Sequence, residues 1–369
     1  MPKLSDAGGP NPRGLREHKG RGSLSNRAGR YEGLTHEAID DGWGAVDEAT
    51  TPLRTTATED KTRSVITRND SPDVPFEQSI NPYRGCEHGC IYCFARPTHA
   101  YLGLSPGLDF ESRLFFKPDA AQLLEREFRN PRYRCQPITL GTNTDPYQPL
   151  ERKLCITRQL LKVLAAHRHP VSIVTKSALV ERDLDILAPM AEKRLANVTI
   201  SITTLDRQLA RRMEPRAAAP ERRLQTLRTV GDAGIPTGVL VAPVIPGLTD
   251  NDLESIVTAC AAVGVCFAGY VLLRLPLEVR DLFKEWLTKH YPMRATHVMS
   301  LIRQTRAGRE NDPRFGARKT GTGHYANMIS HRFRLICKQL YLNKDVIILD
   351  TSQFMLPRVT TVQPGLFDD

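Results

Sequence analysis

The sequence has few cysteines and no long apolar run, and each absence excludes a class of protein. Eight cysteines among 369 residues are too few for a small disulfide-stabilised scaffold. The first ten residues lack the apolar run that a secretory signal needs. The best candidate for a membrane span, 256–273, is interrupted by Thr258, Gly264 and Gly269. We therefore expect a soluble cytoplasmic protein without a membrane partner, whose cysteines serve metal binding or catalysis before disulfides.

The positive charge is concentrated in one segment. The chain has 51 Lys+Arg and 41 Asp+Glu, a net charge of +10. Residues 289–344 contain 12 Lys+Arg and 2 Asp+Glu, so this segment alone accounts for the whole imbalance. It also contains Tyr325, Phe333 and several glycines, which would suit contacts with phosphates and bases. Two interpretations stay open: the segment binds nucleic acid, or it is a solvated surface whose cations neutralise a small anion.

Composition divides the chain into three parts. Residues 1–70 are polar and almost without apolar periodicity, which predicts a largely disordered N-terminal arm. Within that arm, 19–26 could instead lie across a nucleic acid or across the protein's own surface. Residues 71–290 form the predicted catalytic core. Residues 291–369 form a basic, mainly helical C-terminal extension with a tail, and the apolar spacing predicts a helix over 325–342.

The core alternates short apolar runs with amphipathic stretches, which is typical of parallel βα units. Amphipathic stretches include 154–166 and 221–233, the second followed by Gly234 as a helix-ending residue. Six such units fit either a partial (β/α)6 barrel or an open doubly wound sheet, and the pattern does not separate the two. The predicted strands are 79–83, 138–140, 171–175, 198–202, 238–242 and 269–273.

The strongest chemical signal is Cys86-Glu-His-Gly-Cys90-Ile-Tyr-Cys93, directly after the first predicted strand. Soft thiolates this close together suit zinc or an iron–sulfur cluster. A zinc site usually has four ligands in two well-separated pairs, and the sequence has no second pair. Three cysteines can hold three irons of a [4Fe–4S] cluster and leave the fourth open to a ligand. Of the other cysteines, Cys155, Cys260 and Cys266 have apolar neighbours and are expected in the core.

This Cys-x3-Cys-x2-Cys spacing, with an aromatic residue before the last cysteine, resembles the radical S-adenosylmethionine (radical SAM) enzymes. The resemblance implies a partial (β/α)6 barrel and a [4Fe–4S] cluster whose open iron binds S-adenosylmethionine. It also implies an electron donor for the cluster and a 5′-deoxyadenosyl radical that abstracts hydrogen from a substrate. Tracts 79–96, 141–151, 175–177, 201–203 and 241–250 resemble the branch that contains spore photoproduct lyase.

The resemblance also implies roles for individual residues. Cys86, Cys90 and Cys93 would be the iron ligands, and Tyr92 would lie beside the adenine. The other predicted cofactor contacts, to the methionine or the ribose, follow successive strands and are Thr144, Lys176 and Ser201. Alternative interpretations are a solvated charge at the end of a strand for Lys176 and helix caps for Thr144 and Ser201.

One position departs from the branch. Spore photoproduct lyase uses a cysteine on its second-strand loop as hydrogen donor, and the matching tract here begins with Thr142. This departure argues against direct reversal of a thymine dimer by the same route. We expect a radical enzyme that acts on nucleic acid, in DNA repair or base modification. A radical enzyme for a small molecule or a protein side chain, and a zinc-stabilised nucleic-acid-binding module, remain as alternatives.

The last residues suggest a further partner. Gln363, Leu366 and Phe367 resemble the short C-terminal peptide by which bacterial DNA-repair proteins bind the sliding clamp. An exposed Leu-Phe pair on a flexible tail can bind in a hydrophobic pocket. The sequence therefore predicts clamp binding at the C-terminal tail, with a disordered end as the alternative.

Overall fold

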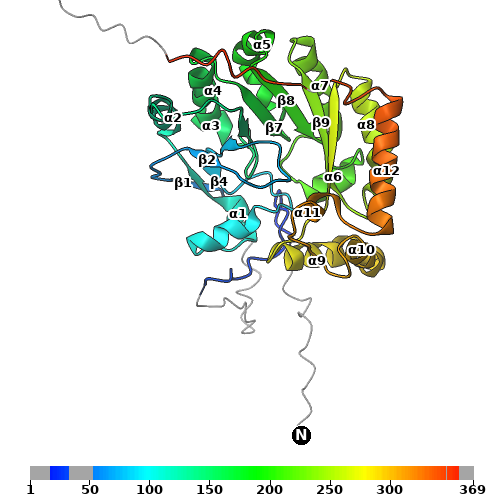
Figure 1. Cartoon of the computed structure of the whole chain (residues 1–369). Coiled ribbons are helices and arrows are strands. Elements are labelled where there is room, and N and C mark those ends of the chain that lie inside the picture. The colour runs from blue at the N-terminus through cyan, green and yellow to red at the C-terminus, as the bar shows by residue number, and fades with distance from the viewer. Residues whose placement is uncertain (1–16, 33–52, 346, 357–369) are drawn as a thin grey trace, which may run out of the picture.

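A seven-stranded sheet forms the centre of the protein (Figure 1). The computed structural model describes residues 17–32, 53–345 and 347–356. From one edge to the other, the strands of this sheet are β10 (Phe267–Leu272), β9 (Thr237–Val244), β8 (Ala196–Ser201), β7 (Val171–Thr175), β6 (Ile138–Leu140), β3 (Gln78–Ile80) and β2 (Ile66–Arg68). A second sheet contains β1 (Thr56–Glu59), β5 (Arg113–Phe116) and β4 (Tyr83–Arg84), in that order.

The six strands that the sequence predicts in the core are all present. They are β3 and β6 to β10, and these six pair with one another in parallel, whereas β2 is antiparallel to β3 at the edge. Burial on both faces explains their composition: every residue of β8 is buried, and Val198 and Ile200 on this strand are at most 1% exposed. β-Branched residues fit such a pleated, fully packed surface.

Strand order decides between the two folds that the pattern left open. The order β3-β6-β7-β8-β9-β10 follows the chain without a reversal. A doubly wound sheet needs a reversal, where the crossovers change direction and helices cover the second face. Right-handed crossovers in one direction instead put every helix on the same side and let the sheet curl. The fold is therefore a partial (β/α)6 barrel, in agreement with the prediction.

Helices follow the strands and enclose the sheet (Figure 1). Those expected at 154–166 and 221–233 are confirmed, and Gly234 follows the second with φ +78°. Up to β10 the helices are α1 (Leu108–Ser112), α2 (Ala120–Phe128), α3 (Glu151–Leu154), α4 (Ile156–Ala166), α5 (Leu184–Glu192), α6 (Arg207–Met213), α7 (Pro220–Asp232) and α8 (Leu253–Ala261). Three short 3-10 helices are Arg96–Leu102, Ala178–Asp183 and Asp250–Asp252.

The longest uncharged stretch, 256–273, divides as the sequence predicts. Helix α8 ends at Ala261, Gly264 turns the chain with φ +89°, and β10 begins at Phe267. In the part of the chain that the structure describes, no helix has the length and apolarity needed to cross a membrane.

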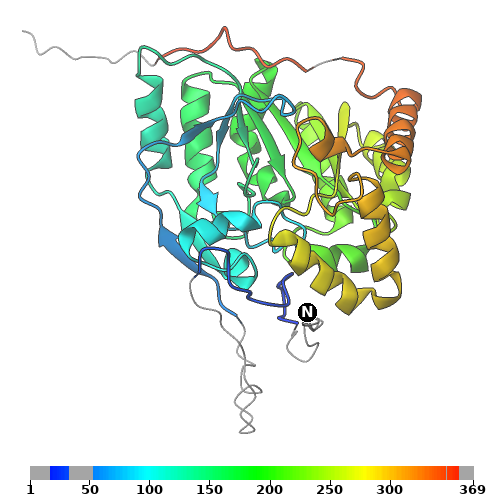
Figure 2. The same ribbon diagram turned by 60° about the horizontal axis from the view of Figure 1, so that its bottom comes forward.

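Part of the N-terminal arm is packed onto the core. Residues 17–32 cross the carboxyl-end side of the barrel, below the sheet in Figure 1 and nearer the viewer in Figure 2. Glu111 accepts hydrogen bonds from the backbone N–H groups of Gly22 and Ser23, both at 2.9 Å. Ser23 and Leu24 are buried because of these contacts. Of the two interpretations of 19–26, the structure therefore shows this stretch on the protein's own surface. The expectation of disorder is wrong for 53–70, because these residues contribute β1 to the smaller sheet and β2 to the larger one. The rest of the expected disorder, in 1–16 and 33–52, lies outside the described residues.

The C-terminal extension is mainly helical, as expected, and the helix predicted over 325–342 is present as α12. The helices of this part are α9 (Val279–His290), α10 (Pro292–Gln304), α11 (Ala317–Thr320) and α12 (His324–Gln339). In Figure 1, α9, α10 and α11 lie below the sheet and α12 lies beside α8. An ion pair between Arg332 on α12 and Glu254 on α8 joins the extension to the barrel at 2.6 Å.

Much of the basic charge in 289–344 is used inside the protein. Arg306 is fully buried and donates to four backbone carbonyls. Four more arginines pair with carboxylates, in the ion pairs Arg303–Glu310, Arg314–Asp312, Arg318–Asp73 and Arg332–Glu254. Five of the 12 cations in this segment are therefore paired with groups of the same chain, and the net charge of the sequence overstates the free positive surface.

Residues 347–356 return across the amino ends of the strands, at the top of Figure 1. The ring of Phe354 packs against Phe128, Tyr133 and His169, with ring centroids 5.3 to 5.5 Å apart. The predicted clamp-binding residues Gln363, Leu366 and Phe367 lie outside the described residues.

Candidate active site

The three cysteines of the motif lie on one loop between β4 and the 3-10 helix that begins at Arg96. Two glycines give this loop its course. Gly85 has φ +77°, and a Cβ there would lie 2.8 Å from the carbonyl oxygen of Phe110. Gly89 has φ +66°, and a Cβ there would meet the Glu111 carboxylate at 2.7 Å. Only glycine fits both the left-handed backbone and these close approaches.

The thiols are shielded from water. Cys86 and Cys90 are each 7% exposed, and Cys93 is partly buried. Burial raises the pKa of all three thiols above the ordinary cysteine value, well above it for Cys86 and Cys90. Without a bound cation these groups would therefore be neutral, and a metal that binds them would displace their protons.

One cavity at the carboxyl ends of the strands brings the predicted residues together. The three cysteines, Tyr92, Thr144, Lys176 and Ser201 all line it. They come from the cysteine loop and from the ends of β6, β7 and β8, which are adjacent in the sheet. Parallel strands end at the same edge, so residues far apart in the sequence meet there.

Lys176 sits at the centre of the cavity's polar groups. Its ammonium donates to Ser201 Oγ at 2.6 Å and lies 3.7 Å from Glu214 Oε1. It also lies 5.8 Å from the centroid of the Tyr92 ring. Burial lowers the pKa of Lys176 to about 8. The alternative interpretation of Lys176 as a solvated charge is therefore wrong.

A buried carboxylate holds Tyr92 and Lys176 in place. Glu214 accepts a hydrogen bond from the Tyr92 hydroxyl and forms an ion pair with Arg223. It also accepts a hydrogen bond from Thr203 Oγ1 at 2.7 Å. Sequence reasoning missed Glu214, because it follows α6 in an irregular segment and meets Tyr92 and Lys176 only through the tertiary fold.

Thr144 and Ser201 do not cap helices. Thr144 Oγ1 donates to the Tyr83 carbonyl at 2.9 Å, and Ser201 Oγ donates to the Ala242 carbonyl at 3.2 Å. Their neighbour Asp145, which the sequence did not single out for a role, accepts from the Lys176 backbone N–H at 2.7 Å. Burial opposes the charged form of Asp145, but the charge of His88 and its contact at 3.3 Å outweigh this and lower the pKa of the carboxyl.

Comparison with known proteins assigns this site to a superfamily. The model of the Radical SAM superfamily matches residues 80–260. An uncharacterised protein of Mycobacterium tuberculosis (strain ATCC 25618 / H37Rv) is 37% identical over 233 residues, which are 63% of this chain and 68% of that protein. The chain belongs to the radical SAM superfamily of enzymes. An uncharacterised protein of Methanocaldococcus jannaschii is 28% identical over 214 residues, 58% of this chain and 76% of that protein.

Solved structures show the same fold. Spore photoproduct lyase complexed with dinucleoside spore photoproduct has a TM-score of 0.54 at 17% identity, and the match covers 77% of this chain and 79% of that one. A double mutant of that lyase with bound AdoMet and dinucleoside spore photoproduct has a TM-score of 0.55 at 16% identity, with the same coverage. The radical SAM fold implied by the cysteine motif is thus confirmed.

The cavity fits the groups that a radical SAM fold implies, an iron–sulfur cluster and S-adenosylmethionine. Three buried thiols line it, and none of the other five cysteines does, so a cubane cluster held there keeps one open position. Among the described residues, no group of three or more His, Cys, Asp or Glu is arranged to hold a metal ion by itself. The thiols of the loop are suitable ligands for the irons of the cluster. The nearby Lys176 ammonium is a suitable partner for the carboxylate of S-adenosylmethionine.

The remaining cysteines lie away from this chemistry. Cys260 is fully buried in the core, as expected, and Cys155 is partly buried. The expectation for Cys266 is wrong: it is exposed, because it lies in the turn before β10, which is an edge strand. Cys135 precedes β6 at the amino end of the barrel and does not line the cavity.

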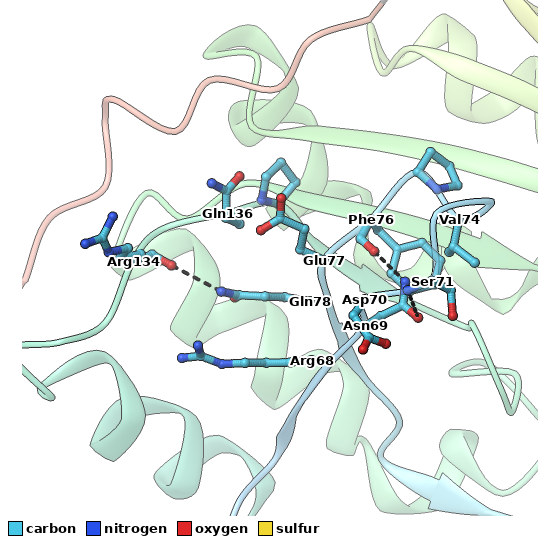
Figure 3. Close-up of a pocket in the computed structure, with 12 residues that line it drawn as sticks. Arg68, Asn69, Asp70, Ser71, Val74, Phe76, Glu77, Gln78, Arg134 and Gln136 are labelled. Carbon is cyan, nitrogen blue, oxygen red and sulfur yellow. Dashed lines mark hydrogen bonds between the residues drawn. The ribbon is translucent and has the colours of Figure 1, made fainter.

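A second hollow, shown in Figure 3, lies at the amino ends of β3 and β6. Its lining includes Arg68, Asp70, Glu77 and Arg134, so charges of both signs alternate around it. The Gln78 side chain donates to the Arg134 carbonyl at 3.1 Å across this hollow (Figure 3). None of the cysteines or predicted cofactor residues reaches it, and the chemistry therefore belongs to the cavity at the other end of the strands.

Proposed function

We propose that this chain binds a [4Fe–4S] cluster through Cys86, Cys90 and Cys93 and cleaves S-adenosylmethionine reductively for chemistry on nucleic acid. The observation that carries the proposal is the cavity shared by three thiols, two of them buried, and a partly buried lysine. When bound and reduced, the cluster supplies the electron that converts S-adenosylmethionine to methionine and a 5′-deoxyadenosyl radical.

The residues around the thiols would bind and orient the cofactor. The Lys176 ammonium offers a charge-assisted hydrogen bond to the methionine carboxylate, and Ser201 holds the ammonium in position at 2.6 Å. The Tyr92 ring, fixed by Glu214, offers an apolar face for the adenine. Burial of this region, where Thr144 is 2% exposed, keeps water from a radical formed there.

Nucleic acid is the substrate class that the available charges support best. Seven cations of 289–344 remain outside the five arginines used within the fold. Several of them, such as Arg294, Arg334 and Lys338, are exposed. The spore photoproduct lyase fold, known with a dinucleoside photoproduct bound, supports the same substrate class.

The hydrogen donor of that lyase has no counterpart in this cavity. Thr142 lines the cavity where the branch has its cysteine, and no cysteine beyond the three of the motif lines it. A threonine hydroxyl is a far poorer hydrogen-atom donor than a thiol. We therefore infer a DNA-repair or base-modification reaction other than direct reversal of a thymine dimer through such a donor.

Anaerobic reconstitution with iron and sulfide tests the function. We expect a brown protein with about four irons per chain, and 5′-deoxyadenosine on reduction in the presence of S-adenosylmethionine. Added DNA or RNA should change the yield of 5′-deoxyadenosine. Bound zinc without turnover would contradict the proposed enzymatic activity. Turnover that responds only to a metabolite or a peptide would contradict the proposal that nucleic acid is the substrate.

A further inference from the structure

Arg274 lies at the mouth of the thiol cavity, and among the described residues its Nε has no hydrogen-bond acceptor. It lies two residues beyond β10, lines the cavity, and is partly buried. Its Nε is buried and makes no hydrogen bond within the part of the chain that the structure describes. A buried donor of this kind is costly unless a ligand satisfies it. Burial and the neighbouring Arg318 lower the pKa of Arg274, and the negative charge of Asp73 does not offset them.

The charges around Arg274 leave an excess of positive charge. Among the described residues, Asp73 is the carboxylate whose charge acts on Arg274, and Arg318 engages it in an ion pair. Lys319 follows on α11 and is partly buried, and its pKa is lowered mainly by burial and also by Arg318 and Arg274. One carboxylate therefore faces three cations, which favours an anionic ligand at this place.

Two exposed aromatic rings accompany these cations. The Arg274 guanidinium lies 5.4 Å from the centroid of the Phe94 ring, which lines the cavity and is 45% exposed. The Arg318 guanidinium lies 4.6 Å from the centroid of the Phe315 ring, which is 58% exposed. Large apolar side chains interleaved with arginines are typical of surfaces that bind single-stranded nucleic acid, where bases stack and phosphates pair with cations.

We propose that Arg274 and Phe94 form a nucleotide subsite, in which Arg274 binds a backbone phosphate of a single nucleic-acid strand and Phe94 packs against a base. This subsite rests on the proposed function and extends it by naming the residues that receive the substrate. Its position suits a substrate rather than the cofactor: Phe94 and Arg274 lie at the exposed mouth, whereas Lys176 and Ser201 lie inside. A base held there reaches the cavity only when it is unpaired or turned out of a duplex.

Oligonucleotide binding by the reconstituted protein tests the subsite. The probe is a fluorescently labelled single-stranded DNA, with single-stranded RNA of the same sequence as a second arm, titrated at several salt concentrations. Arg274→Gln should weaken binding about tenfold or more and flatten the slope of log K against log salt by about 0.7, the value for one phosphate contact on a single strand. Arg274→Lys should keep the slope, because the charge remains, and Phe94→Ala should weaken binding without changing the slope.

Arg228→Gln on α7 is the matched control, because it removes one exposed positive charge that lies outside 289–344 and does not line the cavity. If Arg274→Gln and Arg228→Gln bind equally well with the same salt slope, the subsite is wrong although the proposed function stands. If Arg274→Gln loses S-adenosylmethionine affinity as strongly as oligonucleotide affinity, Arg274 belongs to the cofactor site and the proposal is overturned. If the wild type cleaves S-adenosylmethionine but binds neither strand, the nucleic-acid function fails and the subsite fails with it.

Discussion

The Lys176 ammonium and the Ser201 hydroxyl lie 2.6 Å apart, at the ends of the neighbouring strands β7 and β8. We predict that Lys176→Gln weakens S-adenosylmethionine binding about ten- to a hundredfold, because a charge-assisted hydrogen bond in a buried site is lost. Equilibrium binding to the reconstituted protein measures the change. Lys193→Gln, which removes an exposed lysine, should bind as the wild type does. Equal affinities for the two variants would remove Lys176 from the cofactor site.

The cysteine loop makes a second prediction. Serine at Cys86, Cys90 or Cys93 should prevent the protein from keeping the cluster, because a hydroxyl is a much poorer iron ligand than a thiolate. The measurements are iron content and the visible absorption of the purified protein. Cys266→Ser changes an exposed thiol outside the cavity and should keep both. Full iron content in any of the three loop variants would contradict the ligand assignment.

Glu214 is a positioning residue whose loss should be costly. Glu214→Gln leaves the buried Arg223 without its anion, and we expect the free energy of unfolding to fall by about 3 kcal/mol. Urea denaturation measures this. Because glutamine has one neutral acceptor oxygen where the carboxylate has two, Tyr92, Thr203 and Arg223 cannot all keep their hydrogen bonds, and S-adenosylmethionine affinity should fall in the protein that remains folded. Glu221→Gln, at an exposed position on α7, should leave both quantities unchanged. A stable Glu214→Gln variant with normal affinity would show that Glu214 positions neither group.

A substitution at Gly22 tests whether residues 17–32 pack against the cysteine loop. A Cβ at Gly22 would lie 1.9 Å from the carbonyl oxygen of Gly89 on the cysteine loop. Gly22→Ala should therefore displace the segment and lower the free energy of unfolding by about 1–3 kcal/mol, with faster proteolysis near residue 22. Gly231→Ala in α7 meets its nearest neighbour at 3.8 Å and should be neutral or stabilising. Equal stability of the two variants would mean that the segment does not pack on the loop.

His169 makes the stability depend on pH. Burial lowers the pKa of His169 from 6.5 to about 4, and the ring stacks on Phe128 at 4.8 Å. The folded state therefore favours the neutral ring. Its contribution is complete above the unfolded value of 6.5 and is lost as the pH falls toward 4.

We expect the free energy of unfolding to drop by about 2 kcal/mol between pH 7 and pH 5 because of this group. Urea denaturation at both pH values measures the drop. His169→Gln should reduce it, whereas His324→Gln, which changes an exposed histidine, should not. The same pH dependence in wild type and His169→Gln would assign the effect to other groups.

Local sequence was enough to predict the repeating units and the ligand loop. The strands β6 to β10 are short segments rich in apolar and β-branched residues, which is typical of parallel strands that pack against other elements on both faces. Three thiols within eight residues must be close in any fold, so their shared chemistry is independent of tertiary structure. The positions of Lys176 and Ser201 at strand ends were also predictable, because parallel strands end at one edge.

Other features of the site could not be inferred from local patterns. Glu214 and Arg274 lie in irregular segments whose course depends on packing. Nothing in the neighbouring sequence indicates that Glu214 contacts Tyr92 or that Arg274 lines the cavity. The free positive charge of 289–344 was overestimated for a related reason. A count of charges does not show that Arg306 is buried and donates to backbone carbonyls, or that Arg318 pairs with Asp73, 245 positions away.

The sequence alone determined that Cys86, Cys90 and Cys93 lie together, because residues within one eight-residue segment stay close in any fold. The sequence has few other cysteines, so this spacing was enough to predict a thiolate metal site. The strand order decided that the sheet is a partial barrel, and the meeting of distant strand ends decided what surrounds the thiols. Only the tertiary structure shows which cations remain available to a ligand, because ion pairs form between groups that the completed fold brings together.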